Sequence, residues 1–79
     1  MNIKVLGPGC NNCKTLESRT VEALKALNIT ATIEKVVNYA DIATYGIMRT
    51  PGLVIDGKVV VQGHVPTVEK IKEILLGSV

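Results

Sequence analysis

The sequence is poor in aromatic residues and in cysteine. Its 79 residues include no tryptophan, no phenylalanine and two tyrosines, Tyr39 and Tyr45, which we expect to be packing residues rather than stacking platforms. The only cysteines are Cys10 and Cys13. Hydrophobic residues make up 47% of the chain, so an aliphatic core is possible. A chain of this length predicts a single domain, residues 1–79.

Runs of like charge are also missing. The nine basic residues are spread from Lys4 to Lys72, seven acidic residues are interleaved with them, and the formal net charge is +2. A nucleic-acid-binding surface usually needs basic residues gathered on one face or in one stretch. A mixed, solvated surface is the better prediction.

The opening stretch "MNIKVLGPG" lacks the basic and apolar regions of a secretory signal, and no segment approaches the roughly 20 apolar residues of a membrane span. We therefore expect a soluble, cytoplasmic protein. Thiols are kept reduced in that compartment, where a cysteine pair is more often catalytic or metal-binding than structural.

The hydrophobic pattern predicts seven elements in the order β-α-β-α-β-β-α. Strands are expected at 3–6, 29–37, 53–55 and 58–61, the last two joined by an Asp56-Gly57 turn. Helices are expected after Cys10 to Asn28, over 38–46 with Asn38 as N-cap and Gly46 as stop, and from Thr67 to a stop at Gly77. The first helix carries an apolar stripe at Cys13, Leu16, Thr20, Leu24 and Leu27. The prediction is an α/β fold with a four-stranded mixed sheet flanked by helices.

The stretch "GPGCNNC" places the two cysteines three residues apart, at the start of the first helix. Cβ atoms at i and i+3 of a helix are about 5–6 Å apart, close enough for a disulfide after a small adjustment. The helix N-terminus favours an anion, so it should lower the pKa of Cys10 and make it the attacking thiolate. Cys13 should face the core, remain protonated and resolve a mixed disulfide. A structural staple is the weakest explanation, because so small a loop gains little from closure.

With "IKVLGPGCNNC" at the front, "YGIMRTPGLVIDGKVVVQG" later and a closing helix, the chain resembles the small redox-active disulfide proteins of the thioredoxin superfamily, which are about the size of glutaredoxins. The resemblance covers nearly the whole length. It implies a thioredoxin-like fold and a cis bond before Pro51, with Thr50 and Pro51 presenting an extended substrate beside the disulfide.

The chain departs from thioredoxins proper at several positions. Gly9 replaces an aromatic residue before the first cysteine, and Asn11-Asn12 replaces Gly-Pro between the two. The strand "IKVL" lacks the buried acid that assists proton transfer in thioredoxins. Of the glutathione-binding Gly-Gly and acid of glutaredoxins, only Gly63 remains, followed by His64, for which an exposed loop position is the simpler interpretation.

Two other functions remain open. Cys10, Cys13 and a second chain could form a zinc or copper site, since zinc usually takes four ligands. Alternatively, the domain could be a binding module in which the cysteines are dispensable.

The function predicted best is a dithiol–disulfide oxidoreductase that acts on a protein or small-molecule disulfide. The redox-active Cys10–Cys13 pair carries the electrons, so no cofactor and no metal are expected. We expect a monomer that is reduced by a flavoprotein disulfide reductase, with no nucleic-acid or membrane partner. Met48 and Arg49, which precede Thr50, are expected to border the substrate face.

Overall fold

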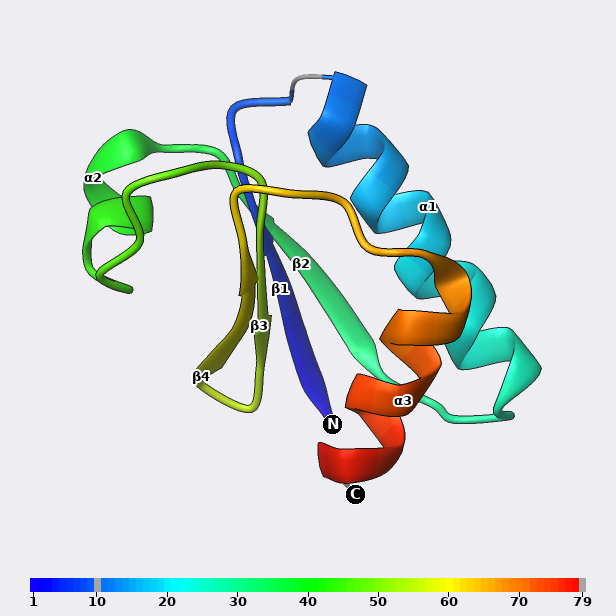
Figure 1. The fold of residues 1–79 in the computed structure, drawn as a ribbon. Helices are drawn as coiled ribbons and strands as arrows, with labels where there is room; N and C mark the ends of the chain where they lie inside the picture. Colours follow the sequence, from blue (N-terminus) through cyan, green and yellow to red (C-terminus); the bar gives the residue numbers. More distant parts are fainter. Residues whose placement is uncertain (10, 79) are drawn as a thin grey trace.

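The computed structural model describes residues 1–9 and 11–78 and has the predicted order of elements (Figure 1). The elements are β1 (Asn2–Leu6), α1 (Asn11–Ala26), β2 (Thr32–Val36), α2 (Tyr39–Ala43), β3 (Gly52–Ile55), β4 (Lys58–Gln62) and α3 (Val68–Ser78). The α/β fold with a four-stranded mixed sheet is confirmed.

Strand β1 lies inside the sheet, whose order is β2-β1-β3-β4. It runs parallel to β2 and antiparallel to β3, and β3 is antiparallel to β4. Helix α1 is the crossover that a parallel pair requires. In Figure 1, α1 and α3 lie to one side of the sheet and α2 lies to the other.

The side chains of β1 alternate between the two faces of the sheet, as a period of two requires. Ile3 and Val5 enter a larger core cluster with residues of α1 and α3, whereas Leu6 enters a smaller cluster beneath α2. The larger cluster includes Leu16, Leu24, Leu53, Ile55, Ile71 and Leu75, and the smaller one consists of Leu6, Ile42, Ile47 and Val54. Because both faces of β1 are covered, its carboxyl end is held in place, and the candidate site starts there.

Helix α1 buries the predicted stripe except Leu27, which lies beyond the helix end and is partly buried. Cys13, Leu16, Thr20 and Leu24 are all buried, and the Thr20 hydroxyl donates to the Leu16 carbonyl at 2.7 Å. The helix ends where expected, because Asn28 takes a left-handed conformation with φ 56°.

The predicted caps and the hairpin turn also form. The Asn38 side chain accepts a hydrogen bond from the Ala40 amide at 2.8 Å and caps α2, and Thr67 caps α3 through the Lys70 amide at 3.2 Å. Asp56 and Gly57 have φ values of 49° and 84°, as a two-residue turn with both central residues left-handed requires.

Four expectations differ from the structure. Helix α2 ends at Ala43, with Thr44 as its C-cap, rather than at Gly46. Strand β2 begins at Thr32 rather than at 29. Thr32 pairs with Asn2, the first residue of β1, so residues 29–31 have no partner in that strand. Gly77 does not stop α3, which continues to Ser78. Tyr39, the first residue of α2, is 67% exposed rather than packed, whereas Tyr45 packs against the smaller cluster as expected.

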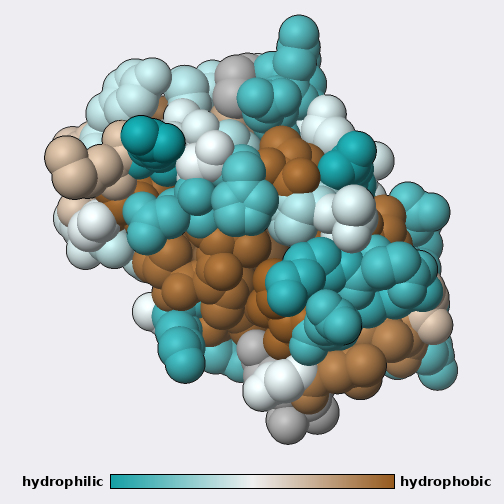
Figure 2. Space-filling model, viewed as in Figure 1, coloured by the Kyte–Doolittle hydropathy of each residue, from teal (hydrophilic) through white to brown (hydrophobic). Residues whose placement is uncertain are grey.

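The surface differs between the two ends of the molecule. The chain termini lie together at the end away from the start of α1 (Figure 1). Figure 2 shows apolar side chains over β3 and β4 and mostly hydrophilic ones at the end where α1 begins. Among the helices of the described part, none is long and apolar enough to cross a membrane.

Candidate active site

The candidate site lies at the carboxyl end of β1, where the chain turns into α1. The Gly7 amide donates to the Val36 carbonyl at 2.9 Å, which continues the pairing with β2 for one residue beyond β1. Cys13 follows in the first turn of α1 and is 5% exposed, facing the core as predicted. Cys10, the predicted nucleophile, lies outside the described residues, so its role remains a prediction.

Gly7 is the residue against which Cys13 packs. A Cβ atom at position 7 would overlap Sγ of Cys13 and lie 3.2 Å from its Cβ. The same Cβ would lie 3.8 Å from Cβ of Thr50. Only the backbone of Gly7 therefore lies between the side chains of Cys13 and Thr50. A side chain at position 7 would displace Cys13.

The register of the sheet brings the Thr50–Pro51 pair to this place. Gly52, the first residue of β3, pairs with Leu6, the last residue of β1. The residues just before β3 therefore lie beside the residues just after β1, because the two strands are antiparallel. Pro51 is fully buried, Thr50 is half-buried, and the peptide bond between them is cis, the isomer that the resemblance implied.

The loop of Met48 and Arg49 leads into this pair. Met48 is 95% exposed. The stem of Arg49 lies across Gly63, where a Cβ would be 3.1 Å from Cβ and Cδ of Arg49. The Gly63 amide in turn donates to the Pro51 carbonyl at 2.9 Å. Gly63 thus connects Arg49 to the proline turn through one contact and one hydrogen bond.

A small pocket of about 60 Å³ opens beside Cys13. Gly7 and Val5 of the β1 end, Lys35 of β2 with Val37 beyond it, and Cys13 and Glu17 of α1 line it. Cys13 and Glu17 share a helix face because they are four residues apart. Lys35 reaches them because its position in β2 is opposite Val5.

An ion pair crosses the pocket. Nζ of Lys35 lies 3.1 Å from Oε2 of Glu17, and the two side chains are 62% and 29% exposed. A pair this accessible contributes only about 0–1 kcal/mol to folding. Both side chains also line the pocket that opens beside buried Cys13. The pocket exceeds the roughly 10–15 Å³ that one water molecule needs.

On the opposite face of β1, Lys4 makes a contact that the sequence did not predict. Its Nζ donates to the Tyr45 hydroxyl at 2.9 Å and lies 5.6 Å from the centre of the ring. This hydrogen bond raises the pKa of Lys4 above its ordinary value. It joins β1 to the segment that follows α2.

His64 is exposed, as the simpler interpretation predicted, and its Nδ1 lies 3.2 Å from the Gln62 carbonyl oxygen. Over residues 1–9 and 11–78, no three His, Cys, Asp or Glu side chains gather into a group that could hold a metal ion.

The structure thus brings together Cys13, Thr50 and Pro51, which the sequence named. It adds Gly7, Glu17 and Lys35, which the sequence analysis missed. The spacing of Cys13 and Glu17 on one helix was the only available signal for the acid. Lys35 had none, because its place depends on strand pairing.

The chain is similar to known proteins over nearly its whole length. A family model described as a thioredoxin domain matches residues 1–76. The chain is 41% identical over 75 residues to a thioredoxin of Methanothermobacter thermautotrophicus, which covers 95% of this chain and 97% of the relative. It is 37% identical over 71 residues to a thioredoxin of Methanocaldococcus jannaschii, covering 90% and 81%.

Proposed function

This chain belongs to the thioredoxin family and is a thiol–disulfide oxidoreductase, and from that premise we propose that Cys10 and Cys13 exchange two electrons with protein or small-molecule disulfides. The observation that supports this most is the packing of buried Cys13 against Gly7, with Thr50 on the other side of that glycine. It holds one sulfur of the pair beside a backbone segment on which a substrate can dock.

The proposed reaction has two exchange steps. The Cys10 thiolate attacks one sulfur of the substrate disulfide, a mixed disulfide forms, and the other substrate sulfur leaves as a thiolate. Cys13 then loses its proton and attacks the sulfur of Cys10. The Cys10–Cys13 disulfide forms, and the second substrate sulfur leaves. The substrate gains two electrons and the protein loses them, so neither a metal nor a further cofactor enters the scheme.

Thr50 and Pro51 are proposed to bind the substrate. Their backbone lies at the start of β3, next to Gly7 and hence next to Cys13. An extended segment of the substrate can pair with the Thr50 backbone and bring its disulfide to the cysteines. In this binding mode, called strand addition, an extended peptide hydrogen-bonds to exposed backbone of the protein.

The proton of Cys13 is proposed to leave through the pocket. Burial disfavours a thiolate, so the second step needs an acceptor close to Cys13. The strand "IKVL" supplies no acid, but the Glu17 carboxylate lines the same pocket as Cys13. A water molecule there can pass the proton to Glu17, and Lys35 holds that carboxylate in place.

Oxidised protein must be returned to the dithiol. A flavoprotein disulfide reductase is the proposed electron donor. The proposed location is the cytoplasm, where thiols are kept reduced. The protein is expected to act as a monomer.

A redox titration tests the proposal. Purified protein is equilibrated in thiol–disulfide buffers with chelator, its free thiols are alkylated, and its mass is measured, with metal content assayed before chelation. We expect one reversible two-electron transition between dithiol and disulfide. Cysteines that never pair, with about half an equivalent of metal per chain, would instead establish a metal site shared by two chains.

A trapping experiment tests the order of attack. The Cys13→Ser variant is expected to accumulate a mixed disulfide with substrate through Cys10, because nothing remains to resolve it. The matched Cys10→Ser variant should trap none, since buried Cys13 is a poor nucleophile. Equal trapping by both variants would refute the assignment of the two roles.

A further inference from the structure

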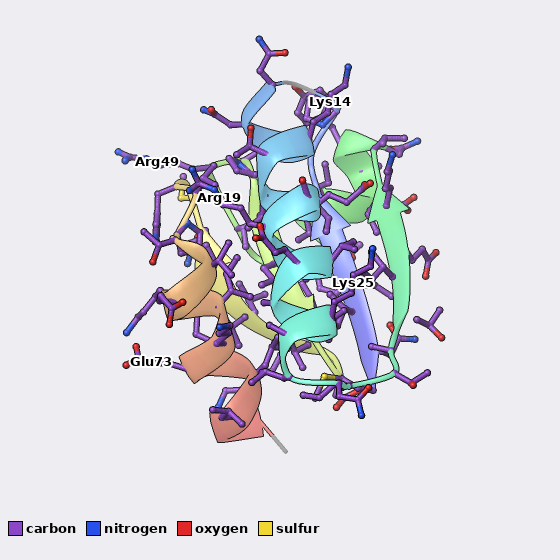
Figure 3. The ribbon with its side chains drawn as sticks, turned by 90° about the vertical axis from the view of Figure 1, so that its right-hand side faces the viewer. Lys14, Arg19, Lys25, Arg49 and Glu73 are labelled. Atoms are coloured by element: carbon purple, nitrogen blue, oxygen red, sulfur yellow. The ribbon has the colours of Figure 1, made fainter. Side chains whose placement is uncertain are left out.

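Lys14 and Arg49 are two exposed cations at the active-site end of the molecule. Lys14 follows Cys13 on α1, and Arg49 directly precedes Thr50. Figure 3 shows both side chains pointing away from the body of the protein, near the end where α1 begins, whereas Lys25 lies further along the helix. Both residues are exposed, and neither has an ion-pair partner within the described part of the chain.

Arg49 is held in position at its base. Its stem lies against Gly63, and Gly63 is hydrogen-bonded to Pro51, so the side chain starts from the same turn that is proposed to receive the substrate. A cation whose stem is already packed loses less conformational entropy on pairing with a carboxylate than a free one does.

The acidic residues of the protein do not neutralise this end. Glu17 is paired with Lys35, and on α3 Glu69 and Glu73 are paired with Lys72 and Lys70. Asp56 lies in the β3–β4 turn, where its carboxylate accepts from the Asn2 amide at 2.7 Å near the chain terminus.

The three remaining acids lie on other elements or further along α1. Glu34 is opposite Lys4 in the β1–β2 register, Asp41 lies on α2, and Glu22 lies two turns beyond Lys14. The candidate site and the Thr50 loop therefore combine Lys14, Lys35 and Arg49 with one carboxylate, that of Glu17.

We propose that this positive end selects protein disulfides whose flanking residues are acidic. The inference rests on the proposed function and names its substrate class. Charge complementarity around a docking site mainly raises the rate of association and disfavours partners of the wrong sign. A basic partner segment would meet Lys14 and Arg49 at the same end of the molecule where its disulfide must react.

The test uses three disulfide-bonded peptides with one common loop and acidic, neutral or basic flanking residues. Prereduced full-length protein is mixed with each peptide, the reaction is quenched with an alkylating agent, and single-turnover rates are measured by mass. At about 0.01 M salt the acidic peptide should be reduced about tenfold faster than the basic one. The difference should disappear at about 1 M salt, where charges are screened within about 3 Å.

Variants locate the effect. Arg49→Gln and Lys14→Gln should each slow reduction of the acidic peptide about threefold at low salt and slow the neutral peptide less. Lys25→Gln is the matched control, since it removes an exposed α1 cation further from the site, and should change neither rate.

The outcomes separate this inference from the proposed function. Equal rates for the three peptides, or equal slowing of acidic and neutral peptides by Arg49→Gln and Lys14→Gln, would overturn the charge selection while leaving the oxidoreductase intact. Failure to reduce any of the peptides would overturn the proposed function and this inference together.

Discussion

At the scale of single residues, the site depends on an absent side chain as much as on the present ones. Gly7 leaves the space that Sγ of Cys13 occupies, and the Thr50 side chain lies just beyond it. Glu17 and Lys35 line the pocket beside the same cysteine. Two residue-scale predictions follow from these contacts.

Gly7→Ala should displace Cys13. The added methyl overlaps Sγ, so the helix start or the Thr50 loop must move, at a cost of about 1–3 kcal/mol in the free energy of unfolding. Misplacement of the sulfur by about 1 Å should slow resolution of the mixed disulfide about 10²-fold, measured by quenched single-turnover kinetics. Gly46→Ala is the control: Gly46 also has a positive φ, 75°, but no atom lies within 4 Å of its added Cβ. An unchanged resolution rate in Gly7→Ala would contradict the packing argument.

Glu17→Gln should slow the resolving step without altering the first attack. Loss of a proton acceptor typically costs about 10²-fold or more, and the deficit should shrink as pH rises because solvent base then takes the proton. The two steps are separated by the rate at which mixed disulfide forms and decays over a pH series. Glu22→Gln, which removes an exposed α1 carboxylate outside the pocket, should leave both steps unchanged. Identical pH profiles for Glu17→Gln and the unaltered protein would exclude this proton route.

At the scale of elements, the end of β1 is held from several sides. Helix α1 covers one face, and Leu6 packs with Ile42 of α2 on the other. The hydrogen bond from Lys4 to Tyr45 adds a polar tie between β1 and the segment after α2. Strand and loop together keep Gly7 and Thr50 in register, so this tie supports the site indirectly.

Tyr45→Phe should lower the thermal stability in a pH-dependent way. The pKa of Lys4 is raised in the folded protein by the Tyr45 hydroxyl, so the bond's contribution is complete below the ordinary lysine value of 10.5 and is lost as pH rises through the folded-state value. The melting temperatures of the two proteins should therefore differ by a constant amount near neutral pH and converge only as pH rises through the folded-state pKa of Lys4, which is above 10.5. Tyr39→Phe, which alters the exposed tyrosine, should follow the unaltered protein throughout. A Tyr45→Phe deficit that persisted at high pH would contradict the assignment of this stabilisation to the hydrogen bond from Lys4.

At the scale of the whole molecule, the larger of the two aliphatic core clusters lies between the sheet and the α1–α3 layer. Ile3, Leu16, Leu53, Ile71 and Leu75 have no exposed surface. A domain of this size has a free energy of unfolding of only about 4–12 kcal/mol. Burial of each of these side chains is therefore large relative to the total free energy of unfolding.

Two adjacent leucines of α3 test this dependence. Leu75→Ala should lower the free energy of unfolding by about 2–5 kcal/mol, since it leaves a cavity in the core. Leu76→Ala should change it by less than about 0.5 kcal/mol, because Leu76 is 60% exposed. Urea titration of both variants gives the two values. Equal losses would mean that α3 does not pack as described.

The order of elements, the caps and the turn were predictable from the sequence, because they depend on neighbours in the chain. Asn38 reaches an amide two residues away, and Asp56-Gly57 needs only its own backbone conformations. The buried stripe of α1, including Cys13, follows from helical periodicity alone. The ends of β2 and α3 were predicted less well. The first residue of β2 is set by where its partner strand β1 begins, which lies far away in the sequence. Gly77 does not end α3, because glycine can also adopt the helical conformation.

The sequence by itself determined which residues carry the thiols, which elements they belong to, and that a Thr-Pro pair precedes the third strand. Only the tertiary structure decided what surrounds Cys13. Thr50 lies near it through the register of β1 with β3, and Lys35 through the register of β1 with β2, and no local pattern encodes those pairings. The segregation of Lys14 and Arg49 to one end arises in the same way, since these cations are distant in the chain and only folding brings their elements to the same end.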